Sequence, residues 1–432
     1  MNQISSTPIA LPDKPAMHNT VRGLSPLGLL VILTGLNLFN YLDRFVVYAV
    51  IEPIKQDFRL TDAQVGWVHP AFMIGYFLTA PFFGYLGDRL SRKWLIAAGI
   101  LVWSVGTVLT GFAGGYVSLL ACRILVGFGE ASYATIGPSL ISDSYRTAQR
   151  NNALTIFYLA IPIGAALGYF AGSRIGTAWG WRYAFIAAGL PGLGLAVSLL
   201  PFREPRRGQA DDLAQEPAEK PSWSDLFRLL RLGDYSLVVW GYAAYTFAMV
   251  GFQFWGSSYL MRFYGLTLRQ AGDYFTSVIA GCGLVSTFAG GFAATAWRKR
   301  NPAAYSLTLS LSTLAAAPFA AWAFLGNSRN GLMIGLATAI FLLLLGNGPV
   351  NTLIVETVPV RLRASAMAMS IFMIHLFGDF WSPALVGRLS VFFGSLKPAV
   401  LILPIALAVG GSLWLVLAFK TLRCCGDKKA HA

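Results

Sequence analysis

The feature that most constrains this chain is a series of apolar segments, each about 20 residues long, with mostly short connections between them. A helix needs roughly 20 predominantly apolar residues to cross the hydrocarbon core of a bilayer. The sequence therefore predicts an all-α membrane protein with 12 transmembrane helices. The expected segments are 27–50, 65–86, 94–112, 116–140, 152–174, 182–201, 235–262, 270–295, 303–325, 331–355, 362–387 and 398–420.

The composition also points to a membrane environment. Hydrophobic residues make up 56% of the chain and charged residues 12%, whereas about 25% of a soluble domain is charged. The net charge is +14, but most Lys and Arg residues lie in connections on one side of the expected bilayer. This asymmetry follows the positive-inside rule. We therefore expect both termini in the cytoplasm, and we expect no nucleic-acid partner.

One connection, at 202–232, is long, polar and charged, and it divides the segments into six and six. Two pseudo-symmetric six-helix bundles around a site near the membrane midplane form a common architecture of secondary transporters. Gly164, Gly168 and Gly172 recur at a spacing that predicts close helix packing. The expected organisation is an N-terminal cytoplasmic tail at 1–26, a first bundle at 27–201, a cytoplasmic linker at 202–232, a second bundle at 235–420 and a cytoplasmic tail at 421–432.

The connection after the second segment, at 84–93, reads GYLGDRLSRK. It closely resembles the signature between helices two and three of the major facilitator superfamily. Gly84 and Gly87 permit a tight turn, Asp88 can accept hydrogen bonds from a facing helix N-terminus, and Arg89 and Arg92 hold the cytoplasmic side. The resemblance implies the major facilitator fold and a conformational latch that closes the cytoplasmic face. A basic loop that only sets the topology is the alternative interpretation.

Charged side chains inside apolar segments are costly and mark functional sites by default. The first segment holds Asp43 and Arg44, and the fourth holds Arg123 and Glu130. Arg123 and Glu130 are seven residues apart, which places them on one helix face about two turns from each other. Two hypotheses follow. The charges form a static ion cluster, or one acid takes up a proton, releases its arginine and changes which side of the protein is open.

Several short segments together resemble the spinster branch of the superfamily, which comprises lysolipid and sphingolipid transporters and their bacterial relatives. The resemblance implies that Asp43 and Glu130 are proton-coupling sites, that Arg123 is their partner and that Arg44 is a cation in the substrate cavity. The matching segments are NYLDR at 40–44, DFRLTDAQVG at 57–66, RILVGFGEA at 123–131, GWR at 180–182 and HLFGD at 375–379.

Four further residues are candidates for the substrate cavity. Asn37 and Tyr41 share one face of the first segment with Arg44, at about 100° per residue. Asp379 is the acid that lies well inside a second-half segment, and His375 precedes it by one turn. His375 can share a proton with Asp379, although a buried structural histidine is an equal alternative.

We therefore expect a proton-coupled secondary active transporter, spinster-like, that moves an amphipathic lipid such as a lysophospholipid or a sphingolipid-like molecule by alternating access. The alternative is a proton-coupled symporter of small organic anions such as sugar acids, which needs a compact cavity with several cations. A receptor or scaffold without transport is a third possibility. The sequence lacks a nucleophile elbow, an HExxH motif and a phosphate loop, so we do not expect an enzyme.

We expect membrane lipids, protons and a lipid-like or organic-anion substrate as partners, with no cofactor and no metal, and we expect the protein to act as a monomer. The sequence contains no N-x-S/T acceptor site, and its loops are short. These features favour the bacterial inner (plasma) membrane over an animal membrane.

Overall fold

The computed structural model describes residues 25–199, 204–205, 229–359 and 362–430, and every regular element in these residues is a helix. The elements are α1 (Pro26–Asp57), α2 (Asp62–Gly66), α3 (Val68–Gly87), α4 (Arg92–Gly111), α5 (Tyr116–Ser144), α6 (Thr147–Trp179), α7 (Trp181–Ser198), α9 (Gly233–Tyr264), α10 (Leu268–Arg298), α11 (Ala304–Leu325), α12 (Arg329–Leu344), α13 (Asn347–Glu356), α14 (Arg363–Met373), the π-helix η2 (Ile374–Asp379), α15 (Ser382–Phe393), α16 (Leu396–Ala399) and α17 (Ile402–Ala430).

Each expected apolar segment coincides with a helix or with consecutive helices, so the predicted all-α architecture is confirmed. Within the described residues, ten helical stretches are long and apolar enough to cross a membrane. The other two expected segments, 65–86 and 182–201, are occupied by α3 and α7. The segment 362–387 is not one regular helix, because the π-helix η2 separates α14 from α15 and Pro383 lies in the first turn of α15. Such π-turns often accompany functional sites.

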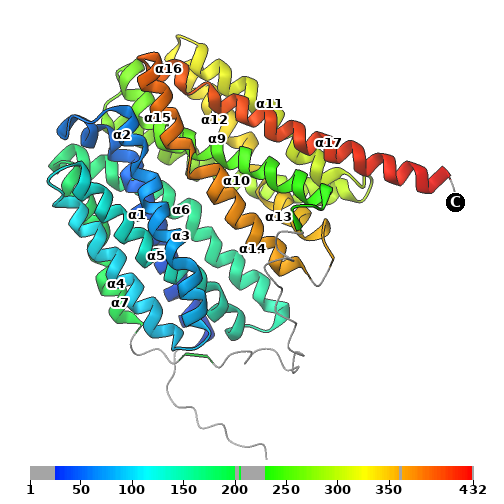
Figure 1. Ribbon diagram of the computed structural model, residues 1–432, viewed down its shortest axis with the longest axis horizontal. Coiled ribbons are helices and arrows are strands. Elements are labelled where there is room, and N and C mark those ends of the chain that lie inside the picture. The colour runs from blue at the N-terminus through cyan, green and yellow to red at the C-terminus, as the bar shows by residue number, and fades with distance from the viewer. Residues whose placement is uncertain (1–24, 200–203, 206–228, 360–361, 431–432) are drawn as a thin grey trace, which may run out of the picture.

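The helices form two groups, α1–α7 and α9–α17 (Figure 1). The groups meet mainly through α6 against α10 and α2 against α15. Figure 1 shows them close together at the end that carries α2 and α16, and diverging away from it. We call this end the α2 end, and the opposite end, at residues 88–91 between α3 and α4, the motif end.

Two of the expected regions are described only in part by the structure. The N-terminal tail at 1–26 and the linker at 202–232 lie largely outside the described residues. The final helix α17 runs to Ala430. The expected tail at 421–432 therefore begins as a continuation of α17 and not as a separate segment.

Close packing of α6 on α1 fixes how α1 is rotated about its own axis. A Cβ atom added to Gly164 would lie 2.5 Å from the carbonyl oxygen of Leu38, and one added to Gly168 would lie 2.6 Å from that of Leu42. The predicted packing role of these glycines is confirmed. Because α1 can approach α6 only with this face, the direction of Asp43 is set by the helix pair.

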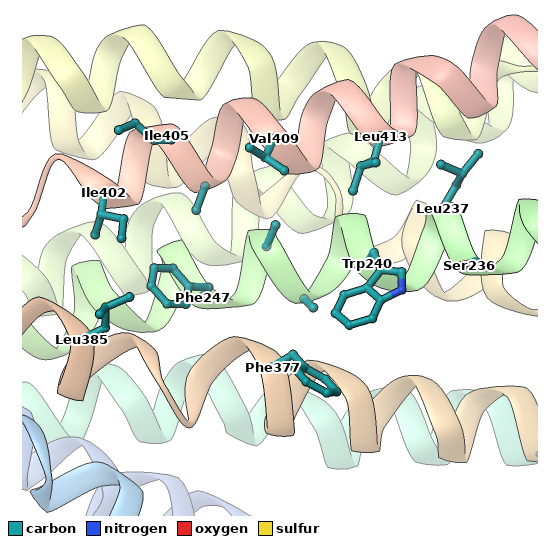
Figure 2. A pocket seen from close by; sticks show the side chains of 13 residues that line it. Ser236, Leu237, Trp240, Phe247, Phe377, Leu385, Ile402, Ile405, Val409 and Leu413 are labelled. Atoms are coloured by element: carbon teal, nitrogen blue, oxygen red, sulfur yellow. The ribbon is translucent and has the colours of Figure 1, made fainter. Parts of the chain in front are cut away.

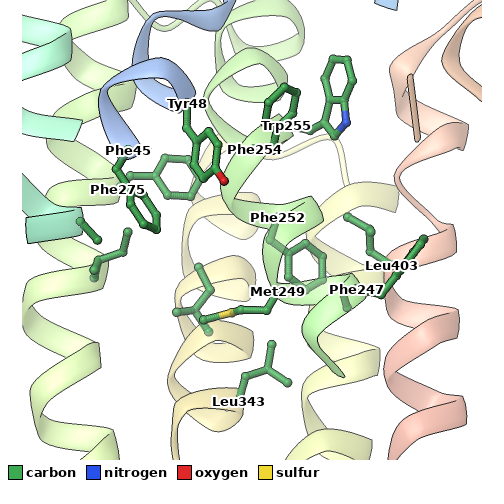
Figure 3. Packing of buried hydrophobic residues seen from close by; sticks show 14 of the residues in the cluster. Phe45, Tyr48, Phe247, Met249, Phe252, Phe254, Trp255, Phe275, Leu343 and Leu403 are labelled. Atoms are coloured by element: carbon green, nitrogen blue, oxygen red, sulfur yellow. The ribbon is translucent and has the colours of Figure 1, made fainter. Parts of the chain in front are cut away.

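An aromatic core joins the two groups toward the α2 end (Figure 3). Tyr48 of α1 contacts Phe254 of α9 with ring centroids 5.4 Å apart, and within α9 Phe254 contacts Trp255 at 5.3 Å. All three rings are buried. Edge-to-face contacts of this kind add about 0.5–1.5 kcal/mol each beyond the burial of apolar area, so this part of the junction is tightly closed.

A cluster of charges at the α2 end also joins the two groups. Arg262 of α9 donates hydrogen bonds to Glu52 of α1 at 2.7 Å and to Asp62 of α2 at 2.8 Å. Lys55 and Ser390 also contact Asp62, at 2.7 and 2.5 Å. We call these five residues the α2-end latch.

The motif end differs from the α2 end. Further polar links between the groups are the Arg174–Asp273 ion pair at 2.9 Å and the hydrogen bond from Tyr169 to the carbonyl oxygen of Gln253 at 2.5 Å. These two links, the α2-end latch and the hydrogen bond from Thr276 to the carbonyl oxygen of Ala166 lie near mid-depth or toward the α2 end. The structure is therefore closed at the α2 end, and these polar links do not extend to the motif end.

Candidate functional site

The buried charges of the first group meet between α1, α4 and α5. Nε of Arg44 donates to Oε2 of Glu130 at 2.6 Å, and the Glu130 side chain is fully buried. Asp43 is also buried and accepts a hydrogen bond from the hydroxyl of Thr107 on α4. Neighbouring residues on α1 thus point to different partners, as the 100° step between them requires.

Arg123 is the residue that the family resemblance implied as the partner of both acids. The direct ion pair of Glu130 is with Arg44. The Arg123 side chain is buried, and its guanidinium lies 5.3 Å from the centre of the Phe72 ring. Among the described residues, Nε and Nη1 of Arg123 have no hydrogen-bond partner. Arg44 lies against the same ring at 4.7 Å, so Phe72 contacts both cations.

Of the two other α1 candidates, Tyr41 lies beside the ion pair and Asn37 has a different contact. The Arg44 guanidinium is 5.1 Å from the centre of the Tyr41 ring. Asn37 donates its amide to the carbonyl oxygen of Phe157 on α6 at 3.0 Å. This bond gives Asn37 a role in packing α1 on α6, and its amide is directed toward that helix.

The second group brings His375 and Asp379 to the same depth. Both lie in η2, with Nδ1 of His375 2.7 Å from Oδ2 of Asp379. Asp379 is buried. The His375 ring lies 6.3 Å, between centroids, from both Tyr76 and Phe77 of α3. The structure thus brings the second-group candidates to the junction with the first group.

Sequence analysis missed His69, which lies on α3 within the expected segment 65–86. Its Nδ1 is 2.8 Å from the hydroxyl oxygen of Tyr48, and the side chain is buried. On α3, His69 lies between Trp67, whose ring contacts that of Phe380 at 6.5 Å, and Tyr76, whose ring contacts that of His375. A search for every ionisable residue within the apolar segments would have found it.

The signature residues lie at the motif end of the first group. Gly84 and Gly87 belong to the last turn of α3, which ends next to Asp88. Arg89 lies over the ring of its neighbour Tyr85. These residues therefore occupy the turn that the signature predicts.

Arg92 links the signature to neighbouring elements. It is buried, and it forms ion pairs with Asp143 at 2.5 Å and with Glu204 at 2.8 Å. Burial alone would raise the pKa of Glu204, but hydrogen bonds from Arg92 and Ser91 outweigh it, and the pKa lies below its ordinary value. Arg92 thus ties α4 to the end of α5 and to the segment that follows α7.

A separate cavity of about 560 Å³ lies among helices of the second group (Figure 2). Trp240 and Phe247 of α9, Phe377 of η2 and residues of α15 and α17 line it. The lining contains no charged residue and none of the site residues expected from the sequence. It is a surface for apolar groups and plays no part in the charge cluster.

The sequence is similar to a known protein family and to known proteins. The family model "Major Facilitator Superfamily" matches residues 33–383. Protein spinster homolog 1 of Homo sapiens is 36% identical over 411 residues, which are 88% of this chain and 76% of that protein. The Sphingosine-1-phosphate transporter SPNS2 of Danio rerio is 32% identical over 433 residues, covering 92% and 85%.

Solved structures show the same fold. A crystal structure of a bacterial homolog to human lysosomal transporter Spinster, in an inward-facing and unoccupied conformation, superposes with a TM-score of 0.83 at 24% identity, covering 92% of this chain and 98% of that one. The inward-facing and occupied conformation gives a TM-score of 0.76. The major facilitator fold expected from the sequence is confirmed.

Proposed function

The chain belongs to the spinster family of the Major Facilitator Superfamily, whose members are membrane transporters and not enzymes, and we propose that it couples proton movement to the transport of an amphipathic lipid. The lipid is a lysophospholipid or a sphingolipid-like molecule, moved by alternating access. The observation that carries this proposal is the ion pair between the partly exposed Arg44 and the fully buried Glu130, beside the buried Asp43.

Proton coupling follows from the charge balance of this cluster. Asp43 and Glu130 contribute two negative charges, and Arg44 and Arg123 contribute two positive charges. Breaking a buried ion pair by neutralising one partner is strongly unfavourable, because the other charge is left uncompensated. Protonation of Glu130 therefore drives Arg44 toward a new anionic partner, such as a lipid headgroup, and favours a different arrangement of the bundles.

The surroundings favour an amphipathic substrate over a small organic anion. Tyr41, Tyr76 and Phe72 surround the Arg44 guanidinium within 5.6 Å of its carbon. At this depth the second group contributes the His375–Asp379 pair, which carries an acid. Among the residues that the structure describes, no arginine or lysine of the second group pairs with the cluster. A sugar-acid site needs several accessible cations around a compact anion. Here Arg123 is buried and Arg44 is the partly exposed cation of the cluster, and a cation bordered by aromatic rings suits a headgroup followed by an apolar chain.

The orientation follows from the positive-inside rule. We place the motif end and both termini in the cytoplasm of a bacterial cell, with the α2 end facing outward across the inner membrane. The closed α2-end latch then makes the described conformation inward-facing. We take 27–201 and 235–420 as the two moving bundles, with the signature at 84–93 closing the cytoplasmic face in the opposite state.

The substrate class is tested by ligand-induced stabilisation of the purified protein. A ligand that binds only the folded state at 100 times its Kd stabilises it by about 2.7 kcal/mol. We expect lysophosphatidylcholine or sphingosine 1-phosphate to raise the Tm, and glucuronate not to do so. Stabilisation by glucuronate alone would favour the organic-anion alternative.

Coupling is tested in liposomes with an imposed pH gradient. We expect Asp43→Asn and Glu130→Gln to keep measurable lipid binding and to lose the acceleration of transport by the gradient. Glu356→Gln is the matched control, because Glu356 is a half-exposed acid paired with Arg298 outside the cluster. If both cluster variants respond to the gradient like the wild type, the buried charges are structural and the coupling proposal fails.

A further inference from the structure

Two buried polar groups face the junction from opposite sides and are incompletely hydrogen-bonded. His69 belongs to α3 of the first group, and Asp379 belongs to η2 of the second. The exposed fractions of the two residues are 7% and 6%. Within the described part of the chain, Nε2 of His69 and Oδ1 of Asp379 have no hydrogen-bond partner. Buried polar atoms nearly always have partners, so each exception calls for a physical explanation.

We assign the hydrogen of His69 from its contact with Tyr48, with the hydroxyl as donor. The Tyr48 hydroxyl lies 2.8 Å from Nδ1, and this is the hydrogen bond found for that hydroxyl among the described residues. A hydroxyl that donates to Nδ1 satisfies its own hydrogen and leaves the second ring nitrogen protonated. His69 therefore presents a donor, Nε2–H, to the junction.

Asp379 presents the complementary acceptor. Its Oδ2 atom is bonded to Nδ1 of His375, which leaves Oδ1 to accept from another group. α3 packs along η2 at this point, because the Trp67 ring lies 6.5 Å from the Phe380 ring and the Tyr76 ring lies 6.3 Å from the His375 ring. His69 lies between Trp67 and Tyr76 on α3, and Asp379 lies between His375 and Phe380. The donor from one bundle and the acceptor from the other are therefore neighbours across the junction, although they do not bond each other directly.

We propose that His69 and Asp379 form a hydroxyl subsite for the transported molecule; this inference rests on the proposed lipid-transport function. The bound group must accept from Nε2–H and donate to a carboxylate oxygen at the same time. A hydroxyl does both, whereas an ionised phosphate or an ester only accepts and an ammonium only donates. The free hydroxyl of a lysophospholipid glycerol, or of a sphingoid base, meets this requirement.

The subsite gives a reason for selecting single-chain lipids. In a diacyl phospholipid the corresponding oxygen is esterified and has no hydrogen to donate. Binding it would leave Oδ1 of Asp379 without a partner, and sites built to bond a hydroxyl discriminate strongly against analogues that lack it. Selection thus depends on the hydroxyl as well as on the number of chains.

The test compares two ligands in four proteins. The ligands are lysophosphatidylcholine and its analogue with hydrogen in place of the glycerol hydroxyl, and the proteins are the wild type, His69→Leu, His69→Gln and Thr79→Val. Gln can place an amide donor near the position of Nε2. Thr79 is a control on the same helix, since its hydroxyl donates to the carbonyl oxygen of Gly75 within α3 at 2.7 Å.

We expect the deoxy analogue to bind the wild type and Thr79→Val roughly 10- to 100-fold more weakly than the hydroxyl lipid, as for a hydrogen bond to a charged group. His69→Leu should reduce this ratio to within a few-fold of one, and His69→Gln should retain most of it. Equal binding of both ligands by the wild type overturns the inference while leaving lipid transport intact. If neither lipid binds the wild type, the proposed lipid substrate fails, and the inference fails with it.

Discussion

The α2-end latch makes a quantitative prediction about which end of the protein is closed. Asp62 accepts hydrogen bonds from Arg262 and Ser390 through Oδ2, and Lys55 contacts Oδ1. Only 8% of Asp62 is exposed. Asp62→Asn keeps the shape of the side chain but replaces one acceptor oxygen with an NH₂ donor. At least one cationic partner then faces a donor, and the negative charge between Lys55 and Arg262 is lost.

The size of the effect follows from these contacts. A hydrogen bond to a charged group contributes about 1.5–3 kcal/mol. Arg262 retains Glu52 at 2.7 Å, so the loss is partial, and we take about 2 kcal/mol as the net cost to the closed state. Since about 1.4 kcal/mol corresponds to a tenfold change, the ratio of α2-end-closed to α2-end-open molecules should fall roughly 30-fold.

The same residue predicts a response to pH. Burial alone would raise the pKa of Asp62, but hydrogen bonds from Arg262, Lys55 and Ser390 outweigh burial, and the pKa lies below its ordinary value. A depressed pKa in the closed state stabilises that state above the ordinary aspartate pKa, and the contribution is lost as pH falls through the lowered value. Strong acidification should therefore open the wild-type α2 end, and Asp62→Asn should respond less.

The assay measures distances across the α2 end between spin labels at Gln56 and Asn330, two exposed positions on α1 and α12. Asp57→Asn is the matched control, because Asp57 lies at the same end but pairs with Arg182 of its own group at 2.6 Å. We expect longer distances for Asp62→Asn at neutral pH and an unchanged distribution for the control. An unchanged distribution for Asp62→Asn would refute the latch, as would equal shifts in both variants.

Two further predictions concern helix packing and the motif end. Gly168→Leu should lower the Tm by several degrees in a thermal melt, because even a Cβ atom would lie 2.6 Å from the Leu42 carbonyl oxygen and overpacking costs about 1–3 kcal/mol. The control Gly281→Leu should leave the Tm unchanged, because nothing lies within 4 Å of a Cβ atom there. Asp88→Asn should enrich the inward-facing state in distance measurements across the motif end, because the charge-assisted bonds that we assign to the closed cytoplasmic face are roughly twice as strong as neutral ones. An unchanged population of the inward-facing state would count against a role of Asp88 in closing that face.

The sequence by itself determined the helices and the class of protein. Apolar length and local turn chemistry act within one segment, so the positions of the spans and the turn at 84–93 can be predicted without knowing any neighbour. The glycines at 164, 168 and 172 likewise indicated that α6 carries a close-packing face. Charges inside apolar segments marked Asp43 and Glu130 as candidates, and the family resemblance added their expected role in proton coupling.

Only the tertiary structure decided which side chains of the candidate site contact each other. Helical periodicity gives the angle between Asp43 and Arg44, but the rotation of α1 against α6 determines which of them meets Glu130. That rotation brings Arg44 to Glu130, whereas the family resemblance implied Arg123 as the partner of both acids. The same reason explains why the proximity of His69 to Asp379 was missed: they lie about three hundred residues apart on different bundles, and a pattern within one helix carries no information about the helix that packs opposite it.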